Sequence, residues 1–363
     1  MAGRTVAVAA AGWSTNVGNA FFNIGCHYLL EQVFPDDQVV FLCDQDAYWD
    51  VRTRTTPRNA LGLLKYIRPD YLVLNGCFLT TRFRDMWEET IRALRERGTR
   101  FLYLSAGMNE YSQQEIEHCR RFMAEYPPFV FATRDSTTFE HFKDLAEFAY
   151  DGIDAALFVN DAVTPLKMDA PPFIVLNFDK LPEPLLAVED GPPPPAGFAS
   201  RSARAYQFEF QGRKWTVEFP RVRSVIARWF GKFYPYIEGP LLPKGPLQPR
   251  VGGFEVFRAD HQVNPLVLSK IFRRPRTFVS DLPYGYLTLY ANAALTLSDR
   301  VHACVASMSY GTPAMLFART GRAGLLERAG AATIRERPTL LAPEKIEAEK
   351  ERLLAFLRSV PFA

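Results

Sequence analysis

Residues 294–317 constrain the fold more than any other stretch of this chain. They begin with a short apolar run, break at Ser298 and Asp299, and continue with apolar residues three or four positions apart, at Val301, Val305 and Met308. A Gly-Thr-Pro tripeptide at 311–313 ends this helical pattern, and a second apolar run reaches residue 317. A strand, a helix and a second strand in this order form the repeating unit of a parallel sheet.

Arg300 and His302 lie where the first of these strands passes into the helix. In an open α/β sheet this carboxyl edge is where ligands bind, and the amides of a helix N-terminus favour anions there. An arginine and a titratable imidazole at this edge predict an anionic ligand and a proton transfer. The same residues also fit a structural role, in which Arg300 pairs with a carboxylate and His302 caps or packs. The spacing leaves both interpretations open.

The first part of the chain alternates between apolar runs typical of strands and amphipathic runs typical of helices. Strands are expected at residues 5–11, 38–43, 71–74, 100–104 and 129–133, and helices at 20–33, 84–97, 112–126 and 137–145. This alternation predicts a doubly wound parallel sheet. Small or polar residues at the strand ends would line one crevice of that sheet: Gly12, Gly76, Gly107 and Arg134.

Two of these strand ends carry candidate anion-binding groups. The loop that contains Asn16, Gly18 and Asn19 can turn backbone amides towards an anion, although it is neither a G-x-G-x-x-G motif nor a P-loop, and it also fits a tight turn. Arg134 stands directly before Asp135 and a helix. It fits an anion clamp that faces Arg300, and equally a salt bridge or cap with Asp135.

The second half of the chain repeats this alternation of strands and helices. Strands are expected at residues 173–178, 254–258 and 277–280, and helices at 265–272 and 284–293, before the segment at 294–317. Residues 179–197 are rich in proline and are expected to form a surface loop, and a β-hairpin is expected around Gln211-Gly212-Arg213. His261 fits either a surface loop or the site.

A chain of 363 residues exceeds what one core usually holds, so we expect two domains. We place an N-terminal Rossmann-like domain at residues 1–165 and a C-terminal one at 166–342, with a proline-rich and basic insertion near 179–250. A C-terminal helix in residues 343–363 is expected to pack across both domains.

A basic stretch falls inside the insertion. Residues 201–232 hold eight Lys or Arg and two Asp or Glu, a local charge of +6 (8 − 2), beside an apolar stripe that includes Trp229 and Phe230. The pattern favours a helix at 221–233 that faces the core with a solvated basic side. It also fits a helix that lies on an anionic membrane surface, or a basic side that binds a polyanionic substrate.

The composition narrows the class of function. The net charge of +3 argues against bulk nucleic-acid binding, so no nucleic-acid partner is expected. The five cysteines include no C-x-x-C pair, which fits reduced thiols in a cytosolic protein and predicts no metal site. Neither a signal peptide nor a transmembrane helix is expected from the apolar pattern.

At its best-defined motifs the chain resembles the polysaccharide pyruvyl transferase family. The strongest match is Ser298-Asp299-Arg300-Val301-His302-Ala303, followed by Ala306 and by Gly311-Thr312-Pro313. Weaker matches are Asn16-Val17-Gly18-Asn19, Arg134-Asp135-Ser136 and residues 151–157. The chain departs from the family pattern at Asn75-Gly76-Cys77, which replaces a more glycine-rich turn, and at residues 179–249, which match no motif.

This resemblance implies two Rossmann-like domains that face a cleft, the arrangement called GT-B, with the site between them. It also implies phosphoenolpyruvate as donor, a hydroxyl pair of a glycan or lipid-linked sugar as acceptor, and a pyruvate ketal and phosphate as products, with no redox cofactor. In this interpretation His302 is the general acid that protonates the enol methylene, and Arg300 and Arg134 hold the carboxylate and phosphate. Asn16, Gly18, Asn19 and Ser298 are further candidates for donor binding.

Two other functions remain open from the sequence. A GT-B glycosyltransferase would use the same fold with a nucleotide sugar, and Arg300 would then hold a diphosphate. A glycan-binding protein without catalysis would bind no donor. A transferase of either kind is expected in the cytoplasm, with peripheral contact at the inner membrane face as a further interpretation of the basic stretch.

Overall fold

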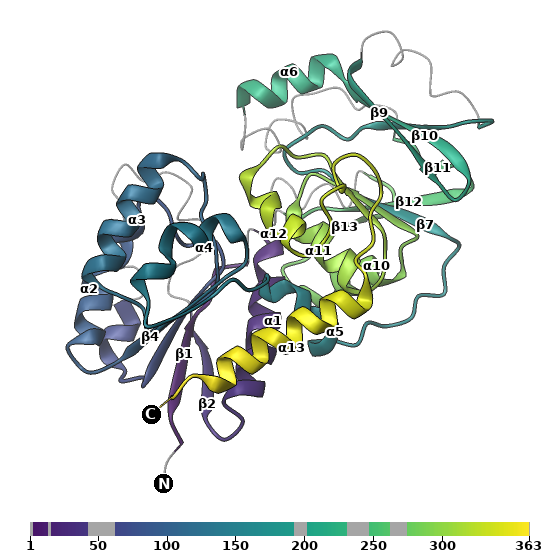
Figure 1. Cartoon of the computed structure of the whole chain (residues 1–363). Coiled ribbons are helices and arrows are strands. Elements are labelled where there is room, and N and C mark those ends of the chain that lie inside the picture. Colours follow the sequence, from purple (N-terminus) through teal and green to yellow (C-terminus); the bar gives the residue numbers. More distant parts are fainter. Residues whose placement is uncertain are drawn as a thin grey trace.

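The computed structural model describes residues 3–13, 16–42, 62–191, 202–230, 247–261 and 274–362. Within these residues the chain forms two lobes, each built around a sheet with helices on its faces (Figure 1). A smaller antiparallel sheet lies beyond the second lobe. The expected strand at 38–43 ends at Leu42, and the expected helix at 265–272 lies outside the described residues.

The N-terminal sheet is parallel throughout and has the strand order β2-β1-β3-β4-β5-β6. Its strands are β1 (Thr5–Ala9), β2 (Gln38–Leu42), β3 (Tyr71–Asn75), β4 (Arg100–Ala106), β5 (Val130–Thr133) and β6 (Phe148–Tyr150). The order reverses between β1 and β3. The loops that follow these two strands therefore open at a topological switch point, where α/β sheets bind ligands.

Both faces of this sheet are covered by helices. Alternate residues of a strand point to opposite faces, so Val6 and Val8 lie in one apolar cluster and Ala7 and Ala9 lie in another. The first face is covered by α1 (Gly18–Val33), and the second by α2 (Phe83–Arg95) and α3 (Gln113–Glu125). This burial explains the near-continuous apolar strands.

The C-terminal sheet has the parallel strands β7 (Phe173–Asn177), β12 (Phe254–Ala259), β13 (Thr277–Phe278), β14 (Leu295–Ser298) and β15 (Ala314–Leu316). The short β11 (Arg250–Val251) pairs antiparallel with β12. β7 lies between β12 and β14, so the switch point falls between β7 and β14. Helices α10 (Tyr284–Asn292) and α11 (Val301–Ser309) cover one face of this sheet.

The other face packs against the three-stranded sheet β8-β10-β9, formed by β8 (Leu185–Val188), β9 (Ser202–Phe210) and β10 (Arg213–Pro220). Leu186 and Trp215 of this sheet share an apolar cluster with Ile174 of β7 and Leu297 of β14. The expected hairpin is confirmed. Its turn at Gln211 and Gly212 has φ of 51° and 69°, the left-handed conformations that a two-residue hairpin turn requires.

The expectation of a surface loop at residues 179–197 is wrong for its middle part. Leu185–Val188 is a strand whose Leu185, Leu186 and Val188 are buried. The prolines of this segment stand outside the strand, at 182 and 184 before it and at 192–195 after it, and β8 is an edge strand, so no proline interrupts a ladder. Residues 192–200 lie outside the described part of the chain.

The last part of the basic stretch forms α6 (Arg221–Phe230), which packs on β9 and β10 and projects from the molecule (Figure 1). The favoured interpretation of a core-facing apolar stripe is wrong for three residues. Val225, Trp229 and Phe230 are 45%, 84% and 48% exposed, whereas Ala227 is buried. Among the described residues α6 packs on β9 and β10, and this contact leaves these three side chains accessible to solvent.

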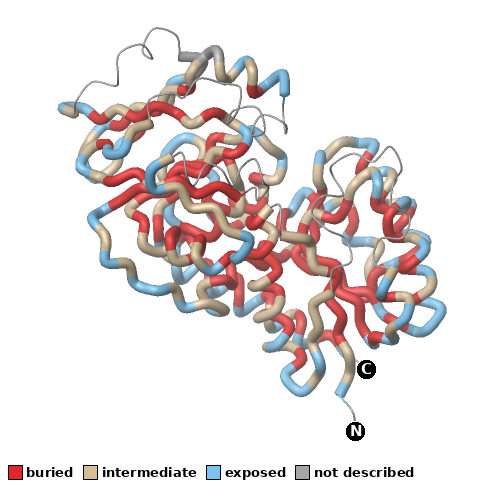
Figure 2. Tube along the Cα trace, turned by 180° about the vertical axis from the view of Figure 1, so that it is seen from behind, coloured by how far each residue is buried: buried red, intermediate tan, exposed pale blue. Residues whose placement is uncertain are grey.

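The last helix, α13 (Pro343–Ser359), runs from the C-terminal lobe to the N-terminal lobe and packs on α1 (Figure 1). Beyond it, the ring of Phe362 lies 4.7 Å from Phe34 and 5.4 Å from Tyr71 of the N-terminal sheet. One buried apolar cluster includes residues of both sheets and of α13, and Figure 2 shows buried residues along the strands of both lobes. The two lobes thus share packing and hold their switch points close together.

Candidate functional site

The two switch points meet through a hydrogen bond between Arg300 and Asn16. Arg300 follows β14, Asn16 precedes α1, and the Arg300 Nη2 atom donates to the Asn16 Oδ1 atom at 2.5 Å. Asn16 Nδ2 in turn donates to Asn19 Oδ1 at 3.0 Å, and Asn19 Nδ2 donates to the Gly12 carbonyl at 2.9 Å. Asn16 and Asn19 are therefore brought to the interdomain junction, where they brace the loop that faces Arg300.

Ser298 lies beneath Arg300. Its hydroxyl accepts a hydrogen bond from the Arg300 backbone N–H at 2.8 Å and donates to Asn177 Oδ1 at 2.9 Å, and the side chain is fully buried. Asn177 Nδ2 reaches the Ala259 carbonyl at 2.6 Å. In this arrangement Ser298 fixes the turn that carries Arg300.

Asp299 closes the switch point of the C-terminal sheet. Its carboxylate accepts hydrogen bonds from three consecutive backbone amides in the loop after β7, those of Asp179, Lys180 and Leu181, at 3.1, 2.7 and 2.6 Å. Asp179 is itself fully buried, and its Oδ2 atom lies 3.4 Å from Arg300 Nε. The loop after β7 and the turn after β14 are thus held together as one unit.

His302, Asp154 and Arg134 form a row that crosses between the lobes. His302 Nε2 lies 3.5 Å from Asp154 Oδ2, and Arg134 Nη1 donates to the same oxygen at 3.2 Å. The other oxygen of Asp154 accepts the Ala156 N–H at 2.8 Å, which caps the short helix η3 (Ala155–Phe158). The side chains of Asp154 and Arg134 are 0% exposed, and that of His302 is 17% exposed.

Burial and the charges in this row set the protonation states of Asp154 and His302. Burial by itself raises the pKa of Asp154, but the hydrogen bond from His302 and the positive charge of Arg134 outweigh it and lower that pKa to about 2. Burial lowers the pKa of His302, and Asp154 opposes this shift in part. At neutral pH Asp154 is therefore a carboxylate and the imidazole of His302 is mostly neutral.

Arg134 does not pair with its neighbour in sequence. Asp135 instead caps α4 (Ser136–Phe142) by accepting the Thr138 N–H at 2.8 Å, and it accepts the Tyr111 hydroxyl at 2.9 Å. The guanidinium of Arg134 lies against Gly107, where a Cβ atom would come within 2.4 Å of Arg134 Nε. The ion-pair partner of Arg134 is thus Asp154, which is distant in sequence, rather than the adjacent Asp135.

Gly18 lies at the centre of the junction. A Cβ atom there would lie 3.4 Å from Asn16 Oδ1, His261 Nδ1 and His302 Cβ. The interpretation of His261 as a surface residue is wrong, because its side chain is fully buried and its Nε2 atom lies 2.5 Å from the Tyr290 hydroxyl. Its backbone carbonyl accepts the Val17 N–H at 2.9 Å, which adds a second bond between the lobes.

Two cations at this junction, Lys180 and Arg322, were not among the residues predicted from the sequence. Lys180 follows β7, and the charges of Arg300 and Arg322 lower its pKa to about 8. Arg322, in the short helix η5 (Gly321–Ala323), donates to the side-chain oxygen of Asn109. Lys180 lies in the loop just after a strand, as Arg300 does, and this position was the available signal. Nothing in the spacing singles out Arg322.

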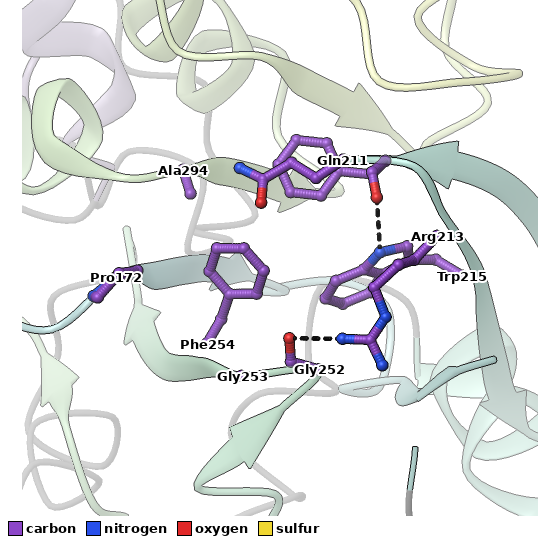
Figure 3. A pocket seen from close by; sticks show the side chains of 9 residues that line it. Pro172, Gln211, Arg213, Trp215, Gly252, Gly253, Phe254 and Ala294 are labelled. Atoms are coloured by element: carbon purple, nitrogen blue, oxygen red, sulfur yellow. Dashed lines mark hydrogen bonds between the residues drawn. The ribbon is translucent and has the colours of Figure 1, made fainter. Parts of the chain in front are cut away.

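A separate hollow of about 330 Å³ lies beside the three-stranded sheet (Figure 3). Pro172 and Ala294, which precede β7 and β14, line it, so it lies at the amino edge of the sheet and away from the junction. The guanidinium of Arg213 is bonded to the carbonyls of Gly252 and Glu189, at 3.0 and 3.1 Å. Two of the donor groups of Arg213 are therefore already used by backbone carbonyls.

Neither metal binding nor membrane crossing is indicated within the described residues. No group of three or more His, Cys, Asp or Glu side chains in these residues is placed to hold a metal ion. None of their helices has the length and apolar character needed to cross a membrane.

A family model described as polysaccharide pyruvyl transferase matches residues 16–321. The match covers most of the chain, including every motif that surrounds the junction. The chain therefore belongs to the polysaccharide pyruvyl transferase family, and it is a transferase. A search of curated proteins found no match to the sequence.

Solved structures resemble the whole chain at low sequence identity. Staphylococcus aureus MnaA, solved with UDP, is 11% identical with a TM-score of 0.52, over 98% of this chain and 91% of that one. A putative UDP-N-acetylglucosamine 2-epimerase from Listeria monocytogenes is 10% identical with a TM-score of 0.49, over 100% of this chain and 93% of that one. The likeness to MnaA confirms the expected α/β fold with two Rossmann-like, GT-B-like domains.

Proposed function

We propose that this enzyme transfers the pyruvate unit of phosphoenolpyruvate to two hydroxyls of a glycan or lipid-linked sugar, forming a pyruvate ketal and releasing phosphate. The observation that carries the proposal is the meeting of cations and a carboxylate-held imidazole at one junction, in a chain of this family. Arg300 comes from the turn after β14, His302 from the first turn of α11, and Arg322 from η5.

The donor carries two anionic groups, and the junction offers cations that can bind them. The side chain of Arg300 is 13% exposed and is braced by Asn16 and Asp179. Arg322 has a neutral partner, the amide oxygen of Asn109, and no carboxylate partner in the described part of the chain. A planar guanidinium binds carboxylate or phosphate through two parallel hydrogen bonds, so an arginine without a carboxylate partner suits either group.

The proton comes from His302. Its Nε2 atom faces Asp154, so Nδ1 is the atom left to donate to the methylene carbon of the donor. Protonation of that carbon makes the adjacent carbon electrophilic. One acceptor hydroxyl then adds to it and gives its proton back to His302. The second hydroxyl displaces phosphate, which departs with the proton of that hydroxyl. The carboxylate of Asp154 stabilises the imidazolium, as the buried aspartate does in a Ser-His-Asp triad.

Arg134 and the bound donor both influence the protonation of His302. The ion pair between Arg134 and Asp154 keeps Asp154 charged, so Asp154 does not take the proton from His302. A bound donor brings negative charge beside the imidazole and raises the pKa of His302 towards neutrality. Burial lowers that pKa in the free enzyme, so we propose that the acid form of His302 is populated mainly when the donor is present.

A nucleotide-sugar glycosyltransferase is the second candidate, because MnaA was solved with UDP on the same fold. One observation weighs against it. The three amides at the β7–β14 switch point already bind the Asp299 carboxylate, so a diphosphate at this edge would find no available amides in that loop. An anion at this edge would instead meet the side-chain cations and the uncapped N-terminus of α11.

A transfer assay in deuterated water tests the proposal. Phosphoenolpyruvate labelled with ¹³C is incubated with enzyme and a panel of soluble and lipid-linked glycans, and products are followed by mass spectrometry and NMR. We expect a ketal whose methyl group carries one solvent deuterium, and loss of the product with His302→Gln. Transfer of a sugar from a nucleotide sugar, with no ketal from the labelled donor, would overturn the proposal.

We also propose that α6 contacts an anionic membrane surface, where a lipid-linked acceptor would lie. Trp229 is 84% exposed and Arg228 is exposed beside it, so an aromatic and a cationic side chain face solvent together. Flotation with anionic and neutral vesicles tests this contact. We expect binding to anionic vesicles that weakens with Trp229→Ser. Absence of binding to anionic vesicles would contradict the proposed membrane contact of α6.

A further inference from the structure

Lys180 has no assigned role, yet its backbone is held at the centre of the site. Its N–H donates to Asp299 Oδ2 at 2.7 Å, between the N–H groups of Asp179 and Leu181, which bind the same carboxylate. Asp299 directly precedes Arg300 in the turn after β14. The side chain of Lys180 therefore leaves the chain from a fixed point next to Arg300.

The charges around the ammonium group of Lys180 are mainly positive. Arg300 has the largest effect on it and Arg322 the next largest among the charged groups, while Asp299 and Asp179 act in the opposite direction. Both carboxylates are already engaged. Asp299 binds the three amides, and Asp179 pairs with Arg300. Burial and the neighbouring Asp260 also raise the pKa of Asp179, which reduces its negative charge.

Lys180 consequently lacks an anionic partner within the described residues, where its ammonium group forms neither an ion pair nor a hydrogen bond. It is exposed to solvent, although protein atoms surround much of its ammonium group. Three like charges close together repel one another at a cost to the folded state. A bound anion would remove that cost, so the cluster of Lys180, Arg300 and Arg322 has the charge of an anion-binding site.

We propose that Lys180 binds the phosphate group of the donor together with Arg300 and Arg322; this inference rests on the proposed function. Phosphate carries nearly two negative charges and presents three acceptor oxygens, whereas the donor carboxylate carries one charge and two oxygens. Three cations therefore match phosphate better than carboxylate. A compact ammonium group also suits a tetrahedral anion as a point charge beside two planar guanidinium forks. The same contact would hold the phosphate as it departs.

Calorimetric titration of the full chain tests the assignment with three probes: phosphoenolpyruvate, inorganic phosphate and pyruvate. For Lys180→Met we expect the Kd of the first two to rise about tenfold to a hundredfold, the usual effect of losing a hydrogen bond to a charged group. Pyruvate affinity should stay unchanged. Lys180→Arg should restore phosphate binding, and Lys167→Met, at an exposed lysine before β7, should leave all three probes unaffected.

A second readout separates a direct role from a structural one. The donor phosphate is fully ionised above about pH 7, so any further loss of affinity reports on the protein. The pKa of Lys180 is lowered to about 8 in the free enzyme, so its charge is lost as pH rises above that value and donor affinity should fall. Lys180→Arg keeps its charge, and its affinity should remain constant over the same range.

The outcomes separate this inference from the proposed function. Wild type that binds phosphoenolpyruvate, with Lys180→Met binding it equally well, would overturn the role of Lys180 alone. Weakened binding of pyruvate but not of phosphate would also overturn it, because Lys180 would then hold the carboxylate. Wild type that binds neither phosphoenolpyruvate nor phosphate would contradict the donor assignment itself.

Discussion

Arg300 and Asn16 are 284 positions apart in the chain, yet the guanidinium of Arg300 donates to the Asn16 side-chain oxygen at 2.5 Å. Each residue lies at the switch point of its own sheet, so this single bond joins the two places where α/β sheets bind ligands. It also directs Arg300 into the junction rather than towards solvent. The orientation of the main cation of the site thus depends on both domains.

Asn16→Ala should loosen Arg300 without removing its charge. We expect kcat/KM to fall about tenfold to a hundredfold, the range for a lost hydrogen bond to a charged group. The melting temperature should change little, because Arg300 keeps its contact with Asp179. Steady-state kinetics and thermal unfolding check this together, and unchanged kcat/KM would show that the bond does not position Arg300 for catalysis.

Asp154→Asn should impair His302 and leave Arg134 buried without a counterion. We expect kcat to fall by about 10² to 10⁴, because the imidazolium loses its carboxylate. The free energy of unfolding should fall by about 3–5 kcal/mol, the usual cost of breaking a buried ion pair.

A double mutant separates these two effects. If Asp154 acts through His302, Asp154→Asn should reduce kcat only slightly further in a His302→Gln background. Its loss of stability should persist in that background, because the Arg134 contact is broken in both. Fully additive losses of kcat would show that Asp154 acts independently of His302.

Gly107→Ala should destabilise the fold through Arg134. The new Cβ atom would lie 2.4 Å from Arg134 Nε, so the guanidinium or the β4 backbone must shift. We expect a loss of about 1–3 kcal/mol in chemical denaturation, the range for overpacking a core. Gly324→Ala is the matched control, since its nearest neighbour would be Asp135 Cβ at an ordinary 3.6 Å. Equal stability of the two variants would contradict the close contact.

Stability should decline on the acid side of neutrality because of His261. Burial holds its pKa well below the ordinary value of 6.5, so the folded state keeps the ring neutral while the unfolded state binds a proton. The free energy of unfolding should therefore fall as pH drops below about 6.5, by about 1.4 kcal/mol per pH unit from this residue. Urea denaturation at several pH values should show a shallower decline in His261→Gln. An identical pH dependence would show that His261 does not titrate on unfolding.

Local pattern was sufficient to predict most of the architecture. Strands such as β3 and β14 are short apolar runs bounded by polar or small residues. Helix α3 is preceded by its N-cap Ser112, whose side chain accepts the Glu115 N–H at 3.3 Å. The same pattern placed Arg300 and His302 at a carboxyl edge. Hydrophobic periodicity describes one helix or strand at a time, so it can predict features that lie within a single element.

Features that depend on how elements meet were not predictable. Asp154 and His302 are 148 positions apart and come together only when the two lobes pack. Lys180 lay in a segment interpreted as a proline-rich loop, and Arg322 lies in a turn of three residues without periodicity. The exposure of Trp229 depends on how α6 packs on β9 and β10, which are separate elements.

Donor binding is the measurement that tests the central claim most directly. Thermal unfolding of wild type and Arg300→Ala is followed with phosphoenolpyruvate and with a panel of nucleotide sugars. At about 100 times its Kd, phosphoenolpyruvate should stabilise wild type by roughly 2.7 kcal/mol, and this gain should disappear in Arg300→Ala. Stabilisation by a nucleotide sugar alone would contradict the account and favour a glycosyltransferase.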